Sequence, residues 1–437
     1  MKTGSGYSEW AEAGELIGQG TGGGALVSSI NLDKDIGEFF RGSVEEVIYG
    51  EVRLQPLMFQ DDVVRLAINV SAARAGNERI MNVVKLKQLE IHPDKTGVII
   101  FGDKKSVARE IEQEPIRFND FVTKPKVMDK WLGEMFHMDG LGSSVNATVE
   151  DRVGKVKAAA REIVSVIEDF RMQSIGGAMG ALDLWEAAVL PALLYNSETW
   201  VEIPSKTIET LEEIQNYFVR FLLQVPVSTP KPSLLSETGL MSIKFRIWAR
   251  KLTFTNYLKN MPDESLAGQI FHEQVKRGWP GLAQEARDIC SELGLPNIVK
   301  ENIGKSKWES MVKKAVREVH ERELKESVES KTKLEEIKNQ GVKVKEYFSG
   351  RNIVDTRMMF RIRTQMIELK ANFKNNQKFK KEGWKCEGCG KEVETNGHVM
   401  NCIAYEHVRD GKDLTSDEDL VQFFKEVMKM RMQRKNN

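Results

Sequence analysis

Four potential ligands for a soft metal ion lie near the C-terminus of this 437-residue chain, in the order Cys386-x2-Cys389-x8-His398-x3-Cys402. Two cysteines separated by two residues can direct both thiolates at one point, and a His and a Cys four positions apart share one face of a helical turn. Because four ligands complete a tetrahedral site, we expect a structural Zn²⁺ with no position for a catalytic water. The alternative is four unconnected side chains, which a chain with 4 Cys and 6 His makes less favourable.

Basic and aromatic residues surround the first cysteine pair. They are Lys378, Lys380, Lys381, Trp384, Lys385 and Lys391. Lysines contact phosphates and a tryptophan can stack on a base, so these residues predict a nucleic-acid-binding surface. A solvated basic face beside a structural metal site explains the same composition equally well.

A second group of residues could bind a hard metal ion. Phe59-Gln60-Asp61-Asp62 connects two β-prone runs, residues 52–59 and 63–68, and predicts a hairpin with two carboxylates at its tip. Adjacent carboxylates can bind Mg²⁺, as nucleotidyl transfer by two metals requires, although an Asp-Asp turn is more often only solvated. Pro56 indicates that the first strand lies at a sheet edge or contains a bulge.

Composition limits the class of protein and its location. The 64 Lys and Arg balance 64 Asp and Glu, so the whole chain shows no preference for nucleic acid, membrane surface or acidic ligands. Residues 301–385, however, hold 22 basic and 13 acidic residues, a net charge of +9. The longest uncharged apolar run, residues 187–195, is too short to span a membrane. Grouped cysteines and a polar N-terminus favour an intracellular protein of the nucleus or cytoplasm.

The elements expected around these residues indicate an α+β fold that is mostly α. A helix at 74–89, a turn at 92–95 and a strand at 98–101 follow the hairpin. Thr148 and Asp151 have capping-box spacing and predict the start of a long helix. Another helix is expected to begin after Pro204 and to end before Pro226. Residues 305–340 have the charge pattern of a long helix that projects from the body.

The order of these motifs resembles the reverse transcriptases of the non-LTR (LINE-type) retrotransposons. Gln19-Gly20 resembles the Gln-Gly motif of the palm helix, and Phe59 to Asp62 resembles the aromatic-x-Asp-Asp hairpin, with Gln60 where Ala is usual. Residues 89–96 resemble the segment whose lysine, here Lys95, lies near the nucleotide. Trp131-Leu132-Gly133 resembles the primer-grip hairpin. Residues 196–200, 226–239 and 357–372 resemble later parts, so the likeness covers nearly the whole chain.

The resemblance implies four parts and an activity. Residues 1–135 would form a partial palm with a small antiparallel sheet, 136–270 a helical thumb, 271–375 a charged helical connector, and 376–437 the zinc knuckle with a C-terminal helix. The implied activity is Mg²⁺-dependent DNA synthesis from an RNA template and a DNA primer or target, in a retrotransposon ribonucleoprotein away from membranes.

Roles for individual residues follow from the same resemblance. Asp61 would bind Mg²⁺, Asp62 would support it, and Lys95 would lie near the nucleotide phosphates as the third catalytic residue. Gln19, Gly20 and Phe59 would shape the pocket for nucleotide and template.

One departure from the family limits the expected activity. The family's first metal-binding Asp precedes the Gln-Gly helix, whereas no Asp precedes Asp33 here. We therefore expect an N-terminally truncated polymerase that is inactive alone, since Asp61 and Asp62 cannot complete a two-metal site. Two alternatives stay open. One is a non-enzymatic, zinc-containing nucleic-acid-binding module that uses residues 341–391, with 13 basic and 5 acidic residues. The other is a structural protein in which the acid pair is incidental.

Overall fold

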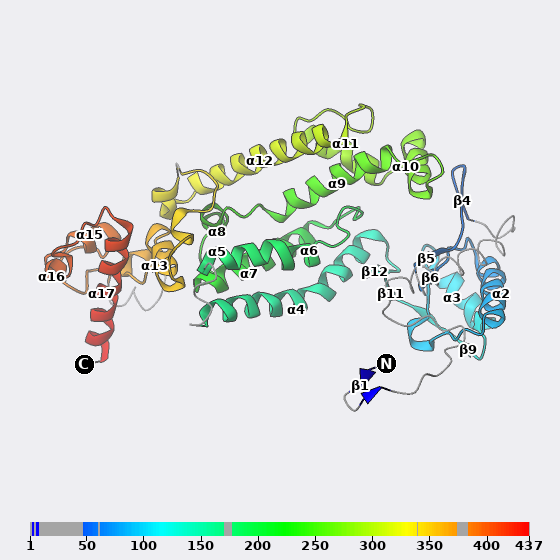
Figure 1. Cartoon of the computed structure of the whole chain (residues 1–437), viewed down its shortest axis with the longest axis horizontal. Helices are drawn as coiled ribbons and strands as arrows, with labels where there is room; N and C mark the ends of the chain where they lie inside the picture. The colour runs from blue at the N-terminus through cyan, green and yellow to red at the C-terminus, as the bar shows by residue number, and fades with distance from the viewer. Residues whose placement is uncertain are drawn as a thin grey trace. The chain divides into compact units, whose positions relative to one another are not determined.

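The computed structural model describes residues 47–59, 62–169, 177–338, 340–373 and 383–436, and the backbone of residues 2–3 and 6–7 (Figure 1). Contacts divide the chain into two compact units. Unit 1 comprises Met1–Ala147 and Met261–Arg277, and unit 2 comprises Thr148–Asn260 and Gly278–Asn437. Helices make up 60% of the structure and strands 8%, which confirms an α+β fold that is mostly α.

Unit 1 contains small sheets beside helices. Its described sheets are all two-stranded, and only the β7–β10 pair is parallel. The strands are β1 (Lys2–Thr3), β2 (Gly6–Tyr7), β3 (Val47–Tyr49), β4 (Val52–Leu54), β5 (Leu57–Phe59), β6 (Asp62–Val64), β7 (Val98–Ile99), β8 (Arg117–Phe118), β9 (Phe121–Val122), β10 (Pro125–Lys126), β11 (Met128–Trp131) and β12 (Glu134–His137). The helices are α2 (Val70–Leu86), η1 (Pro93–Lys95), α3 (Lys104–Gln113) and α10 (Leu266–Arg277).

The core of unit 1 forms where α2 packs against its neighbours. Its buried residues are Val70, Met81, Val84, Ile100, Ile111, Ile116 and Phe118. The β5–β6 hairpin contacts the same helix, because Met58 and Val63 pack against Val83. The predicted hairpin is therefore present, and its first strand is interrupted at Pro56, between β4 and β5. The predicted helix and turn are also present, as α2 and η1, and the predicted strand shortens to β7.

Gly50 allows α10 to approach the turn between β3 and β4. Its φ of +68° is a left-handed conformation, and a Cβ there would lie 2.0 Å from a carboxylate oxygen of Glu273. The amide of Glu51 donates a hydrogen bond to the same carboxylate at 3.2 Å. Residues 261–277 therefore belong to unit 1, although 113 residues of the chain separate them from residue 147.

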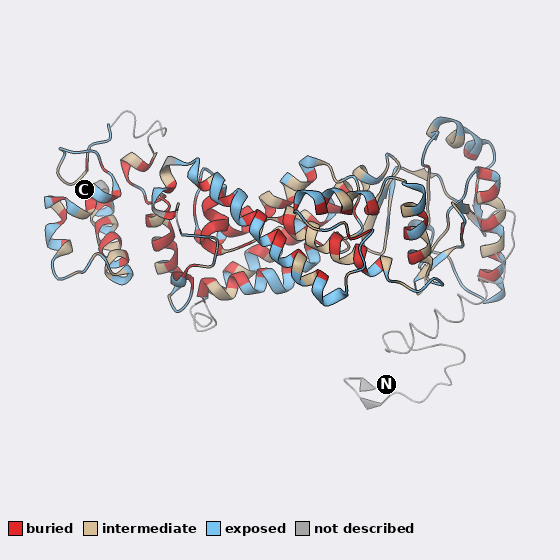
Figure 2. Ribbon diagram, turned by 90° about the horizontal axis from the view of Figure 1, so that it is seen from above, coloured by how far each residue is buried: buried red, intermediate tan, exposed pale blue. Residues whose placement is uncertain are grey.

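Unit 2 consists of helices. They are α4 (Leu141–Glu168, which begins in unit 1), α5 (Gly177–Leu184), η3 (Trp185–Val189), α6 (Leu190–Leu193), α7 (Ser205–Leu223), α8 (Lys231–Thr238), α9 (Ile243–Lys259), α11 (Leu282–Glu292), α12 (Lys305–Glu329), η4 (Thr332–Ile337), η5 (Glu346–Phe348), α13 (Ile353–Arg363), η6 (Lys370–Phe373), α15 (Asn396–Asn401), η7 (Ile403–Tyr405), α16 (Glu406–Arg409) and α17 (Asp417–Asn436). Figure 2 shows buried residues along one side of the long helices and exposed residues along the other. None of the described helices combines the length and the hydropathy needed to cross a bilayer.

The long charged helix α12 packs against the body of unit 2. It lies along α9, and Trp308 is fully buried and donates its indole N–H to the carbonyl of Leu252 at 2.9 Å. The expectation that this segment projects is therefore wrong. Its charges occupy one face only, while apolar residues such as Val312, Val316 and Val319 form a buried stripe on the other.

Helix α4 begins seven residues before the predicted start. Gly140 has a φ of +105°, and Ser144 donates its hydroxyl to the carbonyl of Gly140 at 2.8 Å. Thr148 lies inside the helix and is buried, so its capping-box spacing with Asp151 does not mark the start. By contrast, α7 begins directly after Pro204 and ends before Pro226, as predicted.

Candidate metal centre

The structure brings all four predicted zinc ligands together. The sulfur atoms of Cys386, Cys389 and Cys402 and a ring nitrogen of His398 lie within 4.8 Å of one another. The first two residues lie in a turn after residue 383, His398 lies on α15, and Cys402 follows the end of that helix. These four residues, which we call the metal centre, could bind a metal ion such as zinc.

Two of the separations between ligand atoms match those of a tetrahedral zinc site. Bond lengths of about 2.3 Å for sulfur and 2.05 Å for nitrogen place two sulfurs about 3.8 Å apart and a sulfur and a nitrogen about 3.5 Å apart. The Sγ atoms of Cys386 and Cys402 are 3.9 Å apart, and Cys389 Sγ lies 3.4 Å from His398 Nε2. These two pairs, and the 4.8 Å limit on the whole group, are compatible with zinc binding after a small contraction of the site.

The local backbone explains how the first two cysteines are held. The amide of Gly390 donates to the carbonyl of Cys386 at 2.8 Å, and the amide of Cys386 donates to the carbonyl of Glu392 at 2.7 Å. Gly390 adopts a φ of +68°, which glycine tolerates without strain. Gly388 is needed for another reason, since a Cβ there would lie 3.0 Å from ring carbons of the buried Tyr405.

The two cysteines of this turn differ in their affinity for protons. Burial raises the pKa of Cys386 to about 11. Hydrogen bonds from the backbone amides of Glu392 and Lys391 lower the pKa of Cys389 to about 6. Cys389 can therefore bind a metal ion as a thiolate at neutral pH, whereas binding at Cys386 must release a proton.

His398 is oriented by two neighbours. Its backbone amide donates to Thr395 Oγ1 at 3.1 Å, which caps α15. Its Nδ1 lies 3.2 Å from a carboxylate oxygen of Glu392, while Nε2 faces Cys389. A carboxylate at Nδ1 favours a proton on that nitrogen and leaves Nε2 as the metal ligand.

A buried ion pair supports the metal centre and was missed in the sequence. Glu394, which has no exposed surface, pairs with Arg431 of α17, which is 1% exposed. Glu394 also accepts the backbone amides of Glu387 and Lys370, each at 2.9 Å. The sequence does indicate that Arg431 is buried, because it follows Phe424 and Val427 at helical spacing and so lies on the same apolar face.

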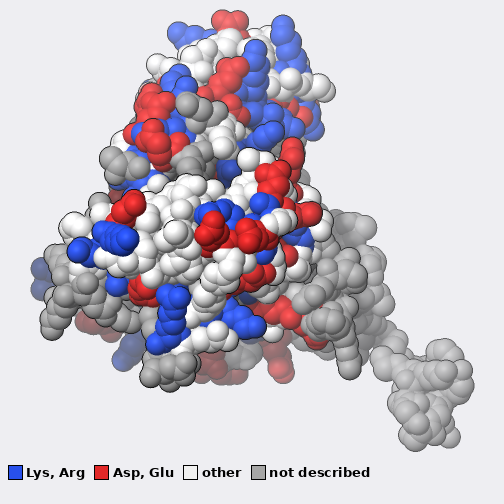
Figure 3. All heavy atoms as spheres, turned by 90° about the vertical axis from the view of Figure 1, so that its left-hand side faces the viewer, with Lys and Arg blue, Asp and Glu red and all other residues white. Residues whose placement is uncertain are grey.

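The residues predicted to bind nucleic acid are only partly described. Lys378, Lys380 and Lys381 lie outside the described residues. Lys385 and Lys391 are exposed, and the Trp384 side chain is 41% exposed. On the face drawn in Figure 3, the described Lys and Arg side chains are interspersed with Asp and Glu.

The residues predicted to serve a polymerase lie in unit 1. Gln19, Gly20 and Asp61 lie outside the described residues. Phe59 and Asp62 are cross-strand partners at the end of the β5–β6 hairpin, and both are exposed. Lys95 is the exposed last residue of η1. Leu132 and Gly133 adopt φ values of +48° and +83° in the two-residue turn between β11 and β12, which forms a second hairpin.

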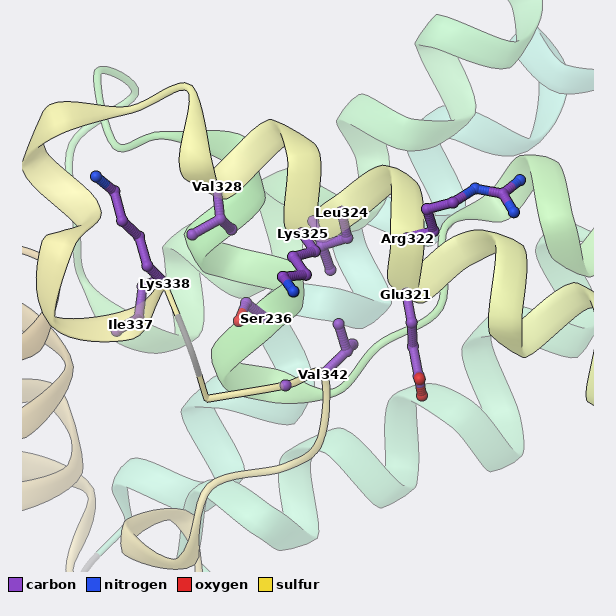
Figure 4. Close-up of a pocket in the computed structure, with 10 residues that line it drawn as sticks. Ser236, Glu321, Arg322, Leu324, Lys325, Val328, Ile337, Lys338 and Val342 are labelled. Carbon is purple, nitrogen blue, oxygen red and sulfur yellow. The ribbon is translucent and has the colours of Figure 1, made fainter.

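The structure also contains a groove that no sequence motif indicated. It has a volume of about 400 Å³ and lies between α12 and the segment that carries Val342 (Figure 4). Leu324, Val328 and Ile337 supply apolar lining, and the charged side chains around the groove are those of Glu321, Arg322, Lys325 and Lys338.

No family model matches the chain, and no curated protein is similar to it in sequence. The geometry of the metal centre and of the hairpins therefore carries the functional interpretation.

Proposed function

We propose that the chain is a fragment of a non-LTR retrotransposon reverse transcriptase whose metal centre organises a nucleic-acid-binding end. The observation that carries the proposal is the convergence of Cys386, Cys389, His398 and Cys402 within 4.8 Å, at the place in the chain where the resemblance requires a zinc knuckle. A structural metal ion contributes folding free energy and fixes the residues around it.

Two hairpins in unit 1 support the same proposal. The resemblance requires one hairpin with an aromatic residue and two acids at its tip, and a second formed around Trp131-Leu132-Gly133. The β5–β6 hairpin carries Phe59 opposite Asp62, and β11 and β12 pair across the Leu132-Gly133 turn. In this proposal Asp61 binds Mg²⁺, Asp62 supports it, and Lys95 lies near the nucleotide phosphates.

We expect the 437-residue polypeptide to lack polymerase activity by itself. Two-metal nucleotidyl transfer needs several converging carboxylates. Among the residues that this proposal assigns to the polymerase site, Asp61 and Asp62 are the only carboxylates. Primer extension on an RNA template with Mg²⁺ tests this expectation: product formation that Asp61→Ala abolishes would show a functional polymerase site.

The second candidate function is a non-enzymatic nucleic-acid-binding module. It is favoured by the exposure of Trp384, Lys385 and Lys391 beside the metal centre. Lysines that contact phosphates give an affinity that falls steeply with salt, while an exposed tryptophan adds base stacking.

A binding experiment separates this candidate from a purely structural role. Single-stranded RNA binding is measured by fluorescence anisotropy over a salt series for the wild type, Lys385→Ala/Lys391→Ala and the control Lys305→Ala/Lys307→Ala on α12, where both lysines are also exposed. The first variant should lower the salt slope by about 1 to 2 units, about one for each phosphate contact, and the control should not. Equal slopes for all three proteins would remove this candidate.

A further inference from the structure

One arginine connects the C-terminal helix to the loop that carries the metal ligands. Arg431 lies on α17, 29 residues after the last ligand, and is 1% exposed. Its guanidinium pairs with Glu394, lies 3.3 Å from a carboxylate oxygen of Glu387, and donates to the carbonyl of Glu368 at 3.0 Å. These contacts place a permanent positive charge inside the protein, next to the metal centre.

The two carboxylates that Arg431 contacts lie within the metal-ligand loop itself. Glu387 directly follows Cys386, and Glu394 lies between Cys389 and His398. The two are connected, because the Glu387 amide donates to the Glu394 carboxylate at 2.9 Å. One guanidinium therefore restrains both the turn that carries the first cysteines and the approach to the helix that carries the histidine.

A further contact brings α17 against the same turn. The guanidinium of Arg434 donates to the carbonyl of Glu387 at 3.2 Å. The Glu394 carboxylate also accepts the amide of Lys370, in the segment after α13, at 2.9 Å. The loop is thus fixed between α17 and the segment after α13.

We propose that Arg431 is a positioning residue of the metal centre, so that metal binding and the docking of α17 stabilise each other. Without Arg431, Glu394 becomes a buried carboxylate without its cation, and the loop must move to hydrate it. That movement separates Cys389 from His398, which lowers the affinity for zinc. Linkage requires the reverse effect to be equally large, so zinc must favour the docked position of α17. The proposal depends on the metal centre and is independent of any polymerase activity.

Zinc affinity provides the direct test. It is measured on the full chain by competition with a chromophoric chelator for the wild type, Arg431→Met and the control Arg322→Met. Arg322 is an exposed arginine on α12, so its replacement removes the same charge away from the loop. Loss of a residue that orients metal ligands typically weakens binding by about 10- to 100-fold. We expect a loss of that size for Arg431→Met and no change for the control.

A double variant separates positioning from a general loss of stability. Glu394→Gln/Arg431→Met removes both fully buried charges, and of the two carboxylates that Arg431 contacts it leaves only the partly exposed Glu387. It should regain a measurable part of the zinc affinity that Arg431→Met loses. Wild-type affinity for Arg431→Met, or an equal loss for Arg322→Met, would overturn the proposal.

Hydrogen exchange on the wild-type chain gives an answer even if Arg431→Met does not fold. Removing zinc with a chelator should accelerate amide exchange in α17 at least about tenfold, because docking and metal binding are linked. Amides of α9, which packs against α12 and α11, should keep their protection. Unchanged exchange in α17, or equal acceleration in both helices, would contradict the linkage.

Discussion

Replacing Arg363 should destabilise unit 2 strongly, because it leaves a second buried carboxylate without its cation. Glu237, which has no exposed surface, accepts Arg363 Nε at 2.6 Å and Nη2 at 3.2 Å. Its carboxylate also accepts the hydroxyl of Tyr347 at 2.8 Å. The three contacts join α8 to α13 and to the short helix η5, which lie far apart in the sequence.

The size of the effect follows from the burial of this network. Removing one partner of a buried ion pair costs about 3–5 kcal/mol, because the remaining charge is uncompensated. We expect Arg363→Met to lower the free energy of unfolding by that amount. Tyr347→Phe should lower the free energy of unfolding by less, about 1.5–3 kcal/mol, because it removes a single hydrogen bond to a charged group. Glu237→Gln/Arg363→Met should be more stable than Arg363→Met alone.

Tryptophan fluorescence in urea is a suitable assay for this prediction. Six of the eight tryptophans occupy positions in unit 2, so the signal reports mainly on that unit. The exposed Arg322→Met variant again supplies the control, and we expect it to shift stability by less than about 0.5 kcal/mol. A similarly small shift for Arg363→Met would refute the assignment of a stabilising ion pair at Glu237.

Two further predictions concern positions where the backbone or burial restricts the residue. Gly239 has a φ of +67°, and a Cβ there would lie 2.5 Å from the amide nitrogen of Val344, whereas Gly278, at +65°, faces open space. Gly239→Ala should therefore lower the free energy of unfolding clearly more than Gly278→Ala, as measured by thermal unfolding. For Gly278→Ala only the left-handed backbone strain of about 1–2 kcal/mol applies. An equal loss of stability in the two variants would contradict the close approach at Gly239. Burial lowers the pKa of His320 below 6.5, so the unfolded chain binds more protons and the free energy of unfolding should fall as the pH drops below about 6.5. His320→Phe should show a shallower fall in urea titrations between about pH 7 and pH 5, and an unchanged slope would argue against a buried neutral histidine.

Much of the metal centre could be predicted because its determinants are local. Cys386, Cys389, His398 and Cys402 lie within 17 residues, and their spacing restricts how their side chains can meet. The hairpin at Phe59 to Asp62 and the limits of α7 were also predictable, because turn residues and prolines act on the backbone directly around them.

The remaining features depend on contacts between distant residues. Arg431 pairs with Glu394, 37 positions away, and nothing in the spacing of either residue identifies its partner. The packing of α12 was missed because its charged face dominated the sequence pattern, whereas its neighbour α9 decides which face is covered. The start of α4 depends on Gly140 and Ser144, whose hydrogen bond is visible only in three dimensions.

The inclusion of residues 261–277 in unit 1 has a consequence for the order of folding during synthesis. The ribosome releases the strands and helices of unit 1 up to residue 147 first, and residues 148–260 follow before α10 emerges. Until then, Glu51 lacks the Glu273 carboxylate that accepts its amide. Completion of unit 1 must therefore wait for chain that belongs to unit 2, and a polypeptide ending at residue 147 would lack one of the helices that its first unit requires.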